Sequence, residues 1–273
     1  TAGAVIAIAE TEFPTDRYVT EGIARLRPGI TVRRGLDDLA GVDVVVRSLV
    51  DYRTAELHDL VAETARARAA GAVTVWDLSH AAGVVEVDLT SAGVDLAAGC
   101  TYKFLNGGPG APAFTFVRSE LHSEVVQPIW GWFGQQDQFA MDNPFTARPG
   151  VGRMLNGTPG ILGMTAARCG IAVSAEAGIA NIATKARVLG SYAIDVAGEL
   201  GLTCSTARPP TSSGGHISII HPNAATLQRR LADRKVIVDK RDPDVLRFGL
   251  SPVTTRFVDV HDGLSALAGM LDE

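Results

Sequence analysis

WDLSH, at residues 76–80, and CTYKFLNGGPG, at residues 100–110, are the two stretches of sequence that decide the fold. Each follows a mostly apolar run, residues 72–76 and 94–98, that suits a buried strand of a parallel sheet. The two runs place Asp77 and Lys103 at or just beyond strand ends, and ligands of such sheets bind outside the carboxyl ends of the strands. The stretches therefore predict a ligand site at one edge of a parallel sheet.

Asp77 and Lys103 suit the opposite ends of a flat, electron-poor cofactor. Pyridoxal phosphate requires this pairing, because a lysine forms a Schiff base with its aldehyde and an acid pairs with its pyridinium nitrogen. The same spacing also fits a plainer interpretation, in which Asp77 caps the turn that follows it and Lys103 is a solvated loop residue. The spacing alone leaves both interpretations open.

The first half of the chain alternates apolar runs with helical periodicity. We expect strands at residues 4–8, 42–46, 72–76, 94–98 and 113–117, and helices from residue 14 to about 26 and over residues 54–70. Gly71 stands where a left-handed residue ends the second of these helices. This order predicts a mostly parallel sheet flanked by helices, with right-handed crossovers.

Residues 127–159 combine aromatic residues with glycines and prolines and show little periodicity, which predicts an irregular loop region. Such a region is either functional or an aromatic patch beneath a domain junction. Beyond it we expect two helices, to about residue 175 and over residues 179–200. A βαββα pattern then follows, with strands at 216–220, 236–238 and 246–248 and helices around 227–231 and from 258. We therefore expect a large cofactor-binding domain over residues 1–158 and a smaller α/β domain over residues 159–273.

The composition of the 273 residues narrows the classes of partner. The formal charge is −5 and no basic block occurs, which argues against nucleic acid or an anionic membrane as a partner. No apolar segment reaches membrane-spanning length, and the N-terminus lacks a signal pattern. The three cysteines are isolated and lack metal-ligand spacing, as is typical of a cytoplasmic protein without a bound metal.

The two opening stretches closely resemble the kynureninases, which are pyridoxal-phosphate enzymes of fold type I. Four shorter motifs match in the family's order and with similar spacing: FPTD (13–16), GWFG (131–134), GTP (157–159) and RFG (247–249). The resemblance covers essentially the whole chain. It implies pyridoxal 5′-phosphate as cofactor and hydrolysis of L-kynurenine, or of 3-hydroxykynurenine, to the corresponding anthranilate and L-alanine, a step of tryptophan catabolism.

The resemblance also implies which residues form the site. Lys103 is the Schiff-base lysine and moves protons, while Asp77 pairs with the ring nitrogen and Tyr102 contacts phosphate and relays protons. Arg247 binds the substrate α-carboxylate, for which its planar fork is suited. The further cofactor contacts are expected to be Phe13 stacked on the ring, Asp16 near the ring nitrogen, and Ser48, His80, Trp132 and Thr158.

Trp132 and Thr158 match family positions that reach the cofactor of the neighbouring subunit, which implies a homodimer with composite active sites. Two departures fall on the substrate side. Gln135 stands where the family has a histidine, and residues 251–254 read SPVT where an aromatic residue is usual. The identity of the amino-acid substrate therefore stays open.

Family members carry a further N-terminal portion, which supplies a helix N-terminus beneath the cofactor phosphate. We therefore expect the large domain to be incomplete at its N-terminus and residues 1–273 alone to hold pyridoxal phosphate poorly. Two alternatives remain: another fold-type-I enzyme, such as an aminotransferase or a desulfurase-like lyase, and a cofactor-less remnant that acts as a binding protein.

Overall fold

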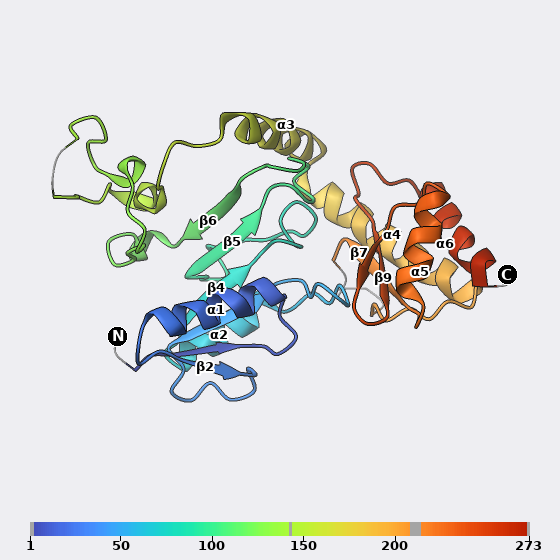
Figure 1. Ribbon diagram of the computed structural model, residues 1–273, viewed down its shortest axis with the longest axis horizontal. Coiled ribbons are helices and arrows are strands. Elements are labelled where there is room, and N and C mark those ends of the chain that lie inside the picture. Colours follow the sequence, from blue (N-terminus) through green and yellow to red (C-terminus); the bar gives the residue numbers. More distant parts are fainter. Residues whose placement is uncertain (1–2, 142–143, 208–213, 272–273) are drawn as a thin grey trace.

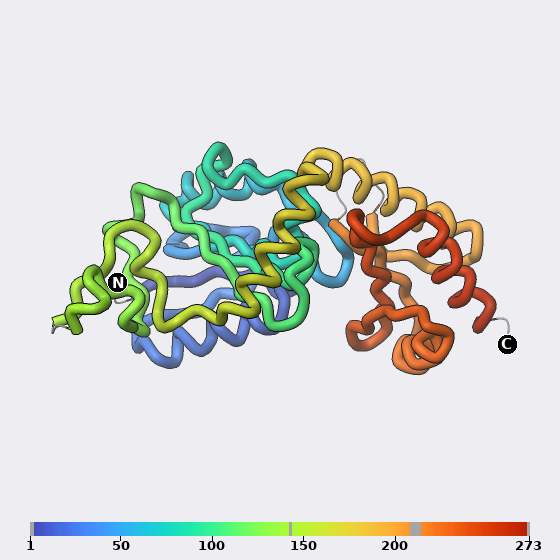
Figure 2. Tube along the Cα trace, turned by 90° about the horizontal axis from the view of Figure 1, so that it is seen from above, coloured from blue at the N-terminus to red at the C-terminus, as the bar shows by residue number. Residues whose placement is uncertain are grey.

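The computed structural model describes residues 3–141, 144–207 and 214–271 of the chain. Two sheets lie next to each other along the long axis of the molecule, and each has its own helices (Figure 1). The view from above shows the same arrangement, with the C-terminal part beside the larger N-terminal part (Figure 2). No helix within the described ranges is both long and apolar enough to span a membrane.

The larger sheet has six strands in the order β2-β1-β3-β4-β5-β6. Its first five strands pair in parallel, and the last pairs antiparallel to its neighbour. The strands are β1 (Val5–Ile8), β2 (Thr31–Arg34), β3 (Val44–Ser48), β4 (Val73–Asp77), β5 (Leu96–Cys100) and β6 (Ala113–Val117). The helices of this part are α1 (Pro14–Leu26) and α2 (Leu60–Ala69). The carboxyl ends of β1, β3, β4 and β5 therefore lie at one edge.

Apolar side chains on β4 and β5 and in the segments that follow β3 and β4 form the core that fixes this edge. Trp76 is only 2% exposed, and its indole N–H donates a hydrogen bond to Thr64 of α2 at 3.0 Å. Residues of a strand alternate between the two faces of a sheet, so burial of Trp76 fixes the direction of the residue that follows it. The sequence WD thus places a buried anchor directly before the carboxylate of Asp77.

The smaller sheet is antiparallel and has the order β7-β9-β8. Its elements are α4 (Ile179–Glu199), β7 (His216–Ile220), α5 (Ala224–Asp233), β8 (Asp239–Arg241), β9 (Val245–Gly249) and α6 (Phe257–Leu271). The three helices and one face of the sheet enclose a separate core, in which Leu189, Ile217, Leu246 and Leu264 are completely or almost completely buried. Burial of these apolar side chains stabilises the smaller part through a core of its own.

The segment between the two sheets is irregular before it becomes helical. Residues 118–160 contain only the 3₁₀ turns η1 (Ser119–Leu121), η2 (Trp132–Gly134) and η3 (Gly150–Met154) among those described, as the sequence predicts for residues 127–159. This segment extends away from the smaller sheet (Figure 1). Helix α3 (Ile161–Ala177) then leads back to α4.

The expected fold class is confirmed, and most element positions agree with the sequence prediction. Three details are wrong. The second helix begins at Leu60, where Asp59 caps its N-terminus, and the strand expected at residues 236–238 lies at 239–241. Edge strand β2 was not expected, because its sequence TVRR has too few apolar residues to indicate a strand. The division of the chain at residue 158 stays a prediction.

The turn between β3 and α2 connects the two sheets. The Asp51 carboxylate accepts hydrogen bonds from the backbone N–H groups of Arg53 and Thr54, which closes a tight turn. The Arg53 carbonyl accepts a hydrogen bond from the Ser218 hydroxyl on β7, and the Ala55 carbonyl accepts one from the Gly214 N–H. Residues 51–55, which we call the bridging turn, therefore attach the smaller sheet to the carboxyl edge of the larger one.

Helix α3 supports the loop that follows Lys103. A Cβ atom built at Gly170 would lie 2.4 Å from the Asn106 carbonyl carbon, and one built at Gly163 would lie 2.5 Å from the Gly110 carbonyl oxygen. Asn106 adopts a positive φ of 59° and donates hydrogen bonds to the Phe104 carbonyl and the Ser174 hydroxyl. The absence of side chains on α3 at these positions lets the loop lie directly against the helix.

We expect Gly170→Ala to destabilise the protein by about 1–3 kcal/mol, because the added methyl group meets backbone atoms that cannot move cheaply. Gly198→Ala, at an exposed helical position of α4 with open space around it, is the matched control and should stabilise by about 0.5–1 kcal/mol. Urea unfolding measures both values. Equal effects of the two substitutions would show that the contact between α3 and the loop is not tight.

Candidate functional site

Three of the predicted residues come together at the carboxyl edge of the larger sheet. Asp16 follows β1, Asp77 ends β4, and Lys103 follows β5. The pKa of Asp16 is raised to about 7, first by burial and then by the negative charges of Asp77 and Glu12, while Lys103 opposes the rise. These mutual effects show that the two carboxyl groups and the amine share one electrostatic environment.

The two carboxyl groups differ in how their oxygens are used. Asp77 Oδ1 accepts hydrogen bonds from the backbone N–H and the hydroxyl of Ser79, which fixes the orientation of its side chain. Asp16 Oδ2 is buried and has no hydrogen-bond partner among the described residues. A buried acceptor without a partner is costly, so this position suits a donor group supplied by a ligand.

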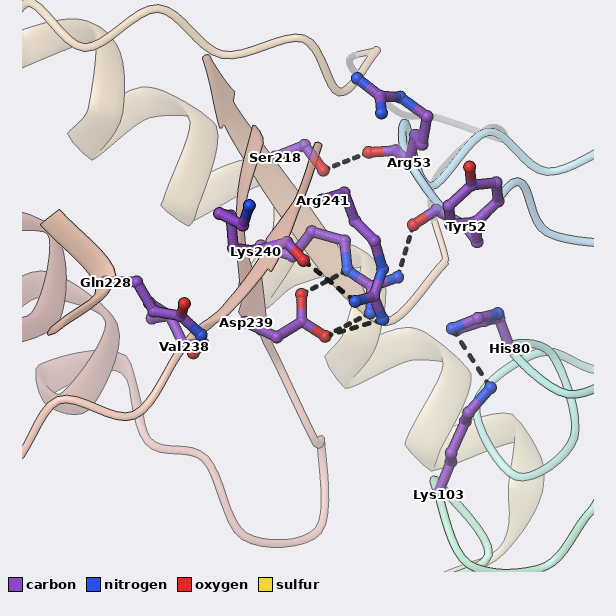
Figure 3. A network of polar contacts seen from close by, with 11 residues as sticks. Tyr52, Arg53, His80, Lys103, Ser218, Gln228, Val238, Asp239, Lys240 and Arg241 are labelled. Atoms are coloured by element: carbon purple, nitrogen blue, oxygen red, sulfur yellow. Dashed lines mark hydrogen bonds and ion pairs between the residues drawn. The ribbon is translucent and has the colours of Figure 1, made fainter. Parts of the chain in front are cut away.

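Lys103 lies beside His80. The distance between Lys103 Nζ and His80 Nε2 is 3.3 Å (Figure 3). Nζ also lies 5.5 Å from the centre of the Tyr102 ring. The pKa of Lys103 is lowered, chiefly because burial disfavours the ammonium form and also because Arg247 and Arg241 repel it. Burial and the nearby cations lower the pKa of His80 to about 2, so this imidazole is neutral and can accept a hydrogen bond from the lysine.

The other predicted cofactor contacts of the larger part have different surroundings. Phe13 packs edge-to-face against Tyr52 with a centroid distance of 5.2 Å. The Ser48 side chain is buried, and its hydroxyl already donates a hydrogen bond to the Glu12 carboxyl group of the same chain. Tyr102 is 48% exposed, and burial of its phenol is the first cause of its raised pKa, so the hydroxyl keeps its proton at neutral pH.

Trp132 and Thr158 belong to the irregular segment that extends away from the smaller sheet (Figure 1). Trp132 is 39% exposed and packs edge-to-face against Phe133 and Phe139, and Thr158 is exposed. Neither residue lines the cavity that contains Lys103. Their expected contact with a neighbouring subunit's cofactor stays a prediction.

A cavity of about 550 Å³ lies between the two sheets. The larger part contributes His80, Tyr102, Lys103 and Phe104, and the smaller part contributes residues that include His216, Asp239, Arg241, Arg247 and Ser251. Arg247 is 7% exposed, and it projects from the face of β9 opposite to the one that Leu246 and Phe248 bury in the smaller core. The cavity thus brings the predicted lysine and the predicted substrate-binding arginine into one site.

Three ionisable residues of this cavity, Asp239, Arg241 and His216, were not predicted from the sequence. Asp239 accepts two hydrogen bonds from the Arg247 guanidinium and one from Arg241 Nη2 at 3.1 Å. His216 is 4% exposed, its Nε2 has no partner among the described residues, and burial lowers its pKa to about 3. The pattern DKR at residues 239–241 could have indicated Asp239 and Arg241 as neighbours, because alternate residues of a strand lie on the same face.

The residues of this edge fit pyridoxal phosphate. The unpartnered Asp16 oxygen and the fixed Asp77 carboxylate suit a cationic ring nitrogen, and Lys103 supplies an amine of lowered pKa for the aldehyde. No group of three or more His, Cys, Asp or Glu side chains in the described part of the chain is placed to hold a metal ion. Asp16, Asp77 and Lys103 therefore match the acid and the amine that pyridoxal phosphate requires.

Comparison with known proteins identifies the family. The kynureninase of Pseudomonas fluorescens is 39% identical over 280 residues, which cover 98% of this chain and 67% of that protein. The chain belongs to the kynureninase family. The kynureninase of Burkholderia mallei is also 39% identical over 98% of this chain, and the family model of the kynureninase C-terminal domain matches residues 182–267. The resemblance seen in the sequence is confirmed.

Solved structures share the fold of this kynureninase-family chain at low sequence identity. A cysteine desulfurase from Thermococcus onnurineus superposes with a TM-score of 0.84 and 18% identity, covering all of this chain and 74% of that one. The cystine C–S lyase C-DES, in a structure of a mutant with glycine linked to its pyridoxal-phosphate cofactor, superposes with a TM-score of 0.84 and 16% sequence identity. The match covers 97% of this chain and 74% of that one. An alanine–glyoxylate aminotransferase from Nostoc sp. superposes with a TM-score of 0.74 and 18% sequence identity, covering 98% of this chain and 75% of that one. These likenesses confirm fold type I.

The raised pKa of Asp16 predicts a pH-dependent stability of the protein without added cofactor. Its pKa of about 7 exceeds the ordinary value of 3.8, so ionisation destabilises the fold progressively as the pH rises from about 4 to about 7. We expect Asp16→Asn, which stays neutral, to raise the melting temperature relative to the wild type by more at pH 8 than at pH 5. Asp37→Asn, at an exposed position, is the control and should show no such difference. A constant effect of Asp16→Asn at both pH values would contradict the assignment.

Proposed function

We propose that this protein is a pyridoxal-phosphate-dependent hydrolase that cleaves the Cβ–Cγ bond of L-kynurenine or 3-hydroxykynurenine. The products are L-alanine and anthranilate or 3-hydroxyanthranilate. The observation that carries the proposal is the single cavity lined by Lys103 from the larger part and Arg247 from the smaller part. Membership of the kynureninase family supports the same reaction.

Pyridoxal phosphate, when bound, supplies a conjugated ring that takes up the electrons left when substrate Cα loses its proton. Asp77 and Asp16 would hold its ring nitrogen, Phe13 would pack on the ring, and Lys103 would hold its aldehyde carbon. His80, Tyr102 and Ser48 complete the proposed contacts within the chain. The Asp77 carboxylate would favour a protonated ring nitrogen, because an opposite charge at short range favours the charged form.

Lys103 is proposed to move the proton at substrate Cα. Its lowered pKa leaves more neutral amine near pH 7 than an ordinary lysine has, so Nζ can accept that proton. Neutral His80, at 3.3 Å from Nζ, accepts a hydrogen bond from the resulting ammonium and keeps it directed into the cavity. Water adds to the side-chain carbonyl carbon Cγ, and when the Cβ–Cγ bond breaks the electron pair stays on Cβ while Cγ leaves as the carboxyl carbon of the anthranilate. Tyr102 keeps its phenolic proton at neutral pH and is the proposed proton donor to Cβ, which completes L-alanine.

Substrate orientation is assigned to the smaller part. The Arg247 guanidinium would bind the α-carboxylate, which leaves the amino group and Cα directed toward Lys103 across the cavity. In this proposal a residue of the smaller sheet binds the substrate α-carboxylate, and a residue that follows a strand of the larger sheet moves the proton at Cα. This arrangement is consistent with any α-amino acid, so the choice of kynurenine rests on the family assignment.

A desulfurase-like reaction is the enzyme alternative, and the cysteines do not favour it. Such a reaction requires a mobile nucleophilic thiol near the lysine. Cys169 is exposed but lies in the middle of helix α3, and Cys204 packs against the core of the smaller sheet. Cys100 ends strand β5, and its thiol contacts the Ser79 carbonyl at 3.6 Å. None of the three lies in a mobile loop.

The proposed partners are a small amino-acid substrate and a second copy of the chain, with Trp132 and Thr158 completing the neighbouring site. We also propose a cytoplasmic location and a place in tryptophan catabolism. Chemical cross-linking and analytical ultracentrifugation of the protein test the dimer directly.

Lys103 should carry the covalent link to the cofactor. We expect the protein saturated with pyridoxal phosphate to be yellow and, after borohydride reduction and proteolysis, to show a pyridoxyl adduct on the peptide that contains Lys103. Mass spectrometry identifies the modified residue, and Lys103→Ala provides the negative control. An adduct on Lys185 or Lys240 instead would contradict the assignment.

Replacement of Asp77 and replacement of Arg247 should change different kinetic constants. Asp77→Ala should retain cofactor but lower kcat strongly, because a neutral pyridine ring withdraws electrons poorly. Arg247→Ala should leave the absorbance spectrum of the bound cofactor unchanged and raise KM, since loss of a buried charged contact costs about 2–5 kcal/mol. Steady-state kinetics and spectra of both variants, with circular dichroism as a folding control, separate these effects. Small and equal losses of activity in both variants would exclude the proposed roles.

A further inference from the structure

Two arginines of the smaller sheet, not one, line the cavity that contains Lys103. Asp239 and Arg247 are directly opposite each other on β8 and β9, and Arg241 lies two residues beyond Asp239 on the same strand. Residues two apart on a strand point to the same face, so all three side chains lie on one face of the sheet. Figure 3 shows Arg241 and Asp239 on one side and His80 with Lys103 on the other.

Most of the hydrogen-bonding capacity of Arg247 is already used within the protein. Its Nε and Nη2 donate to the two oxygens of Asp239, and its Nη1 donates to the Tyr52 carbonyl. An arginine has five N–H groups, and a bidentate pair with a carboxylate uses one edge of its planar fork. Arg247 therefore has few donors left for a substrate carboxylate, and it is 7% exposed.

Arg241 has donors that the protein does not satisfy. Its Nη2 donates to Asp239 at 3.1 Å and its Nη1 donates to the Lys240 carbonyl at 3.0 Å, while its Nε is buried without a partner among the described residues. Its side chain is 31% exposed, compared with 8% for Arg247, so a ligand can reach it more easily. Arg241 is thus the more accessible guanidinium of the pair.

The charges around the two arginines favour an anion. Asp239 offers one negative charge to two guanidiniums, so the cluster keeps a net positive charge. His80 and His216, which also line the cavity, are neutral because burial and neighbouring cations lower their pKa values to about 2 and about 3. The pKa of Arg241 itself is lowered, by burial first and then by Arg247, so an anion bound between them would relieve an unfavourable charge.

We propose that Arg241 contacts the substrate α-carboxylate directly and shares it with Arg247, while Asp239 positions the two guanidiniums. The inference rests on the proposed function and adds to it a second substrate-binding arginine. Asp239 occupies the side edge of the Arg247 fork, which orients that guanidinium, and the substrate carboxylate completes the charge balance of the cluster. Arg241 is therefore a determinant of specificity for amino acids over amines.

The experiment compares a substrate that has the α-carboxylate with an analogue that lacks it. Arg241→Gln, Arg241→Lys and the control Lys240→Gln are made in the holoenzyme. Lys240→Gln removes one positive charge from the adjacent position, whose side chain pairs with Asp242 and does not line the cavity. Steady-state kinetics with L-kynurenine and with its decarboxylated amine give KM and kcat for each protein, and titration gives the affinity for pyridoxal phosphate.

We expect Arg241→Gln to raise KM for L-kynurenine roughly tenfold to a hundredfold, as is typical for loss of hydrogen bonds to a charged group. The KM for the decarboxylated amine and the affinity for the cofactor should stay near the wild-type values. Arg241→Lys should fall between, because it keeps the charge and loses the fork. Lys240→Gln should behave as the wild type with both compounds. Equal changes in KM for both compounds, no change for either, or a loss that follows cofactor affinity alone would overturn the proposal.

Calorimetric binding of L-alanine and of ethylamine to the holoenzyme provides a readout that does not depend on turnover. Arg241→Gln should weaken L-alanine binding and leave ethylamine binding unchanged. If the wild type shows this Arg241-dependent preference but does not cleave L-kynurenine, the proposed reaction fails and the arginine site stands. If it cleaves L-kynurenine and Arg241→Gln affects both ligands equally, the arginine site fails and the reaction stands.

Discussion

The bridging turn, residues 51–55, is the constraint on which the site depends. Its Tyr52 contributes a carbonyl that accepts a hydrogen bond from Arg247 and a ring that packs against Phe13. One residue therefore connects the proposed substrate arginine to the proposed cofactor-stacking phenylalanine. The Asp51 carboxylate closes the turn. Carbonyl groups of the closed turn then accept hydrogen bonds from Ser218, Gly214 and Arg247, which hold the smaller sheet against the larger one at the cavity.

Burial, more than any single ion pair, sets the chemistry of the cavity and of the neighbouring carboxyl edge of the larger sheet. It is the first cause of the raised pKa of Asp16 at that edge and of the lowered pKa values of Lys103, His80 and His216 in the cavity. The result is an acid that holds its proton to near neutrality, an amine that gives up its proton readily, and two uncharged imidazoles. Groups of this kind can exchange protons with a substrate without large changes in the net charge of the site.

The sequence predicted the parts of the fold that have strong periodicity or distinctive turns. The apolar runs ending at Asp77 and before Lys103 were read correctly, because a buried parallel strand requires them. Strand β8 was placed three residues too early, because its charged sequence DKR carries no apolar signal. The same strand supplies Asp239 and Arg241, so the part of the cavity that the apolar pattern does not predict is the part formed where β8 pairs with β9 in a short hairpin.

The separate cores of the two sheets have an evolutionary consequence. The proposed cofactor residues Asp77 and Lys103 are carried by strands packed in the larger core, whereas the proposed substrate residues are carried by β8 and β9 of the smaller sheet. Substitutions on the cavity side of β8 can therefore accumulate without disturbing the layer beneath Asp77 and Lys103. A protein built on this plan can change its substrate through substitutions on β8 and β9 and keep the layer that holds Asp77 and Lys103.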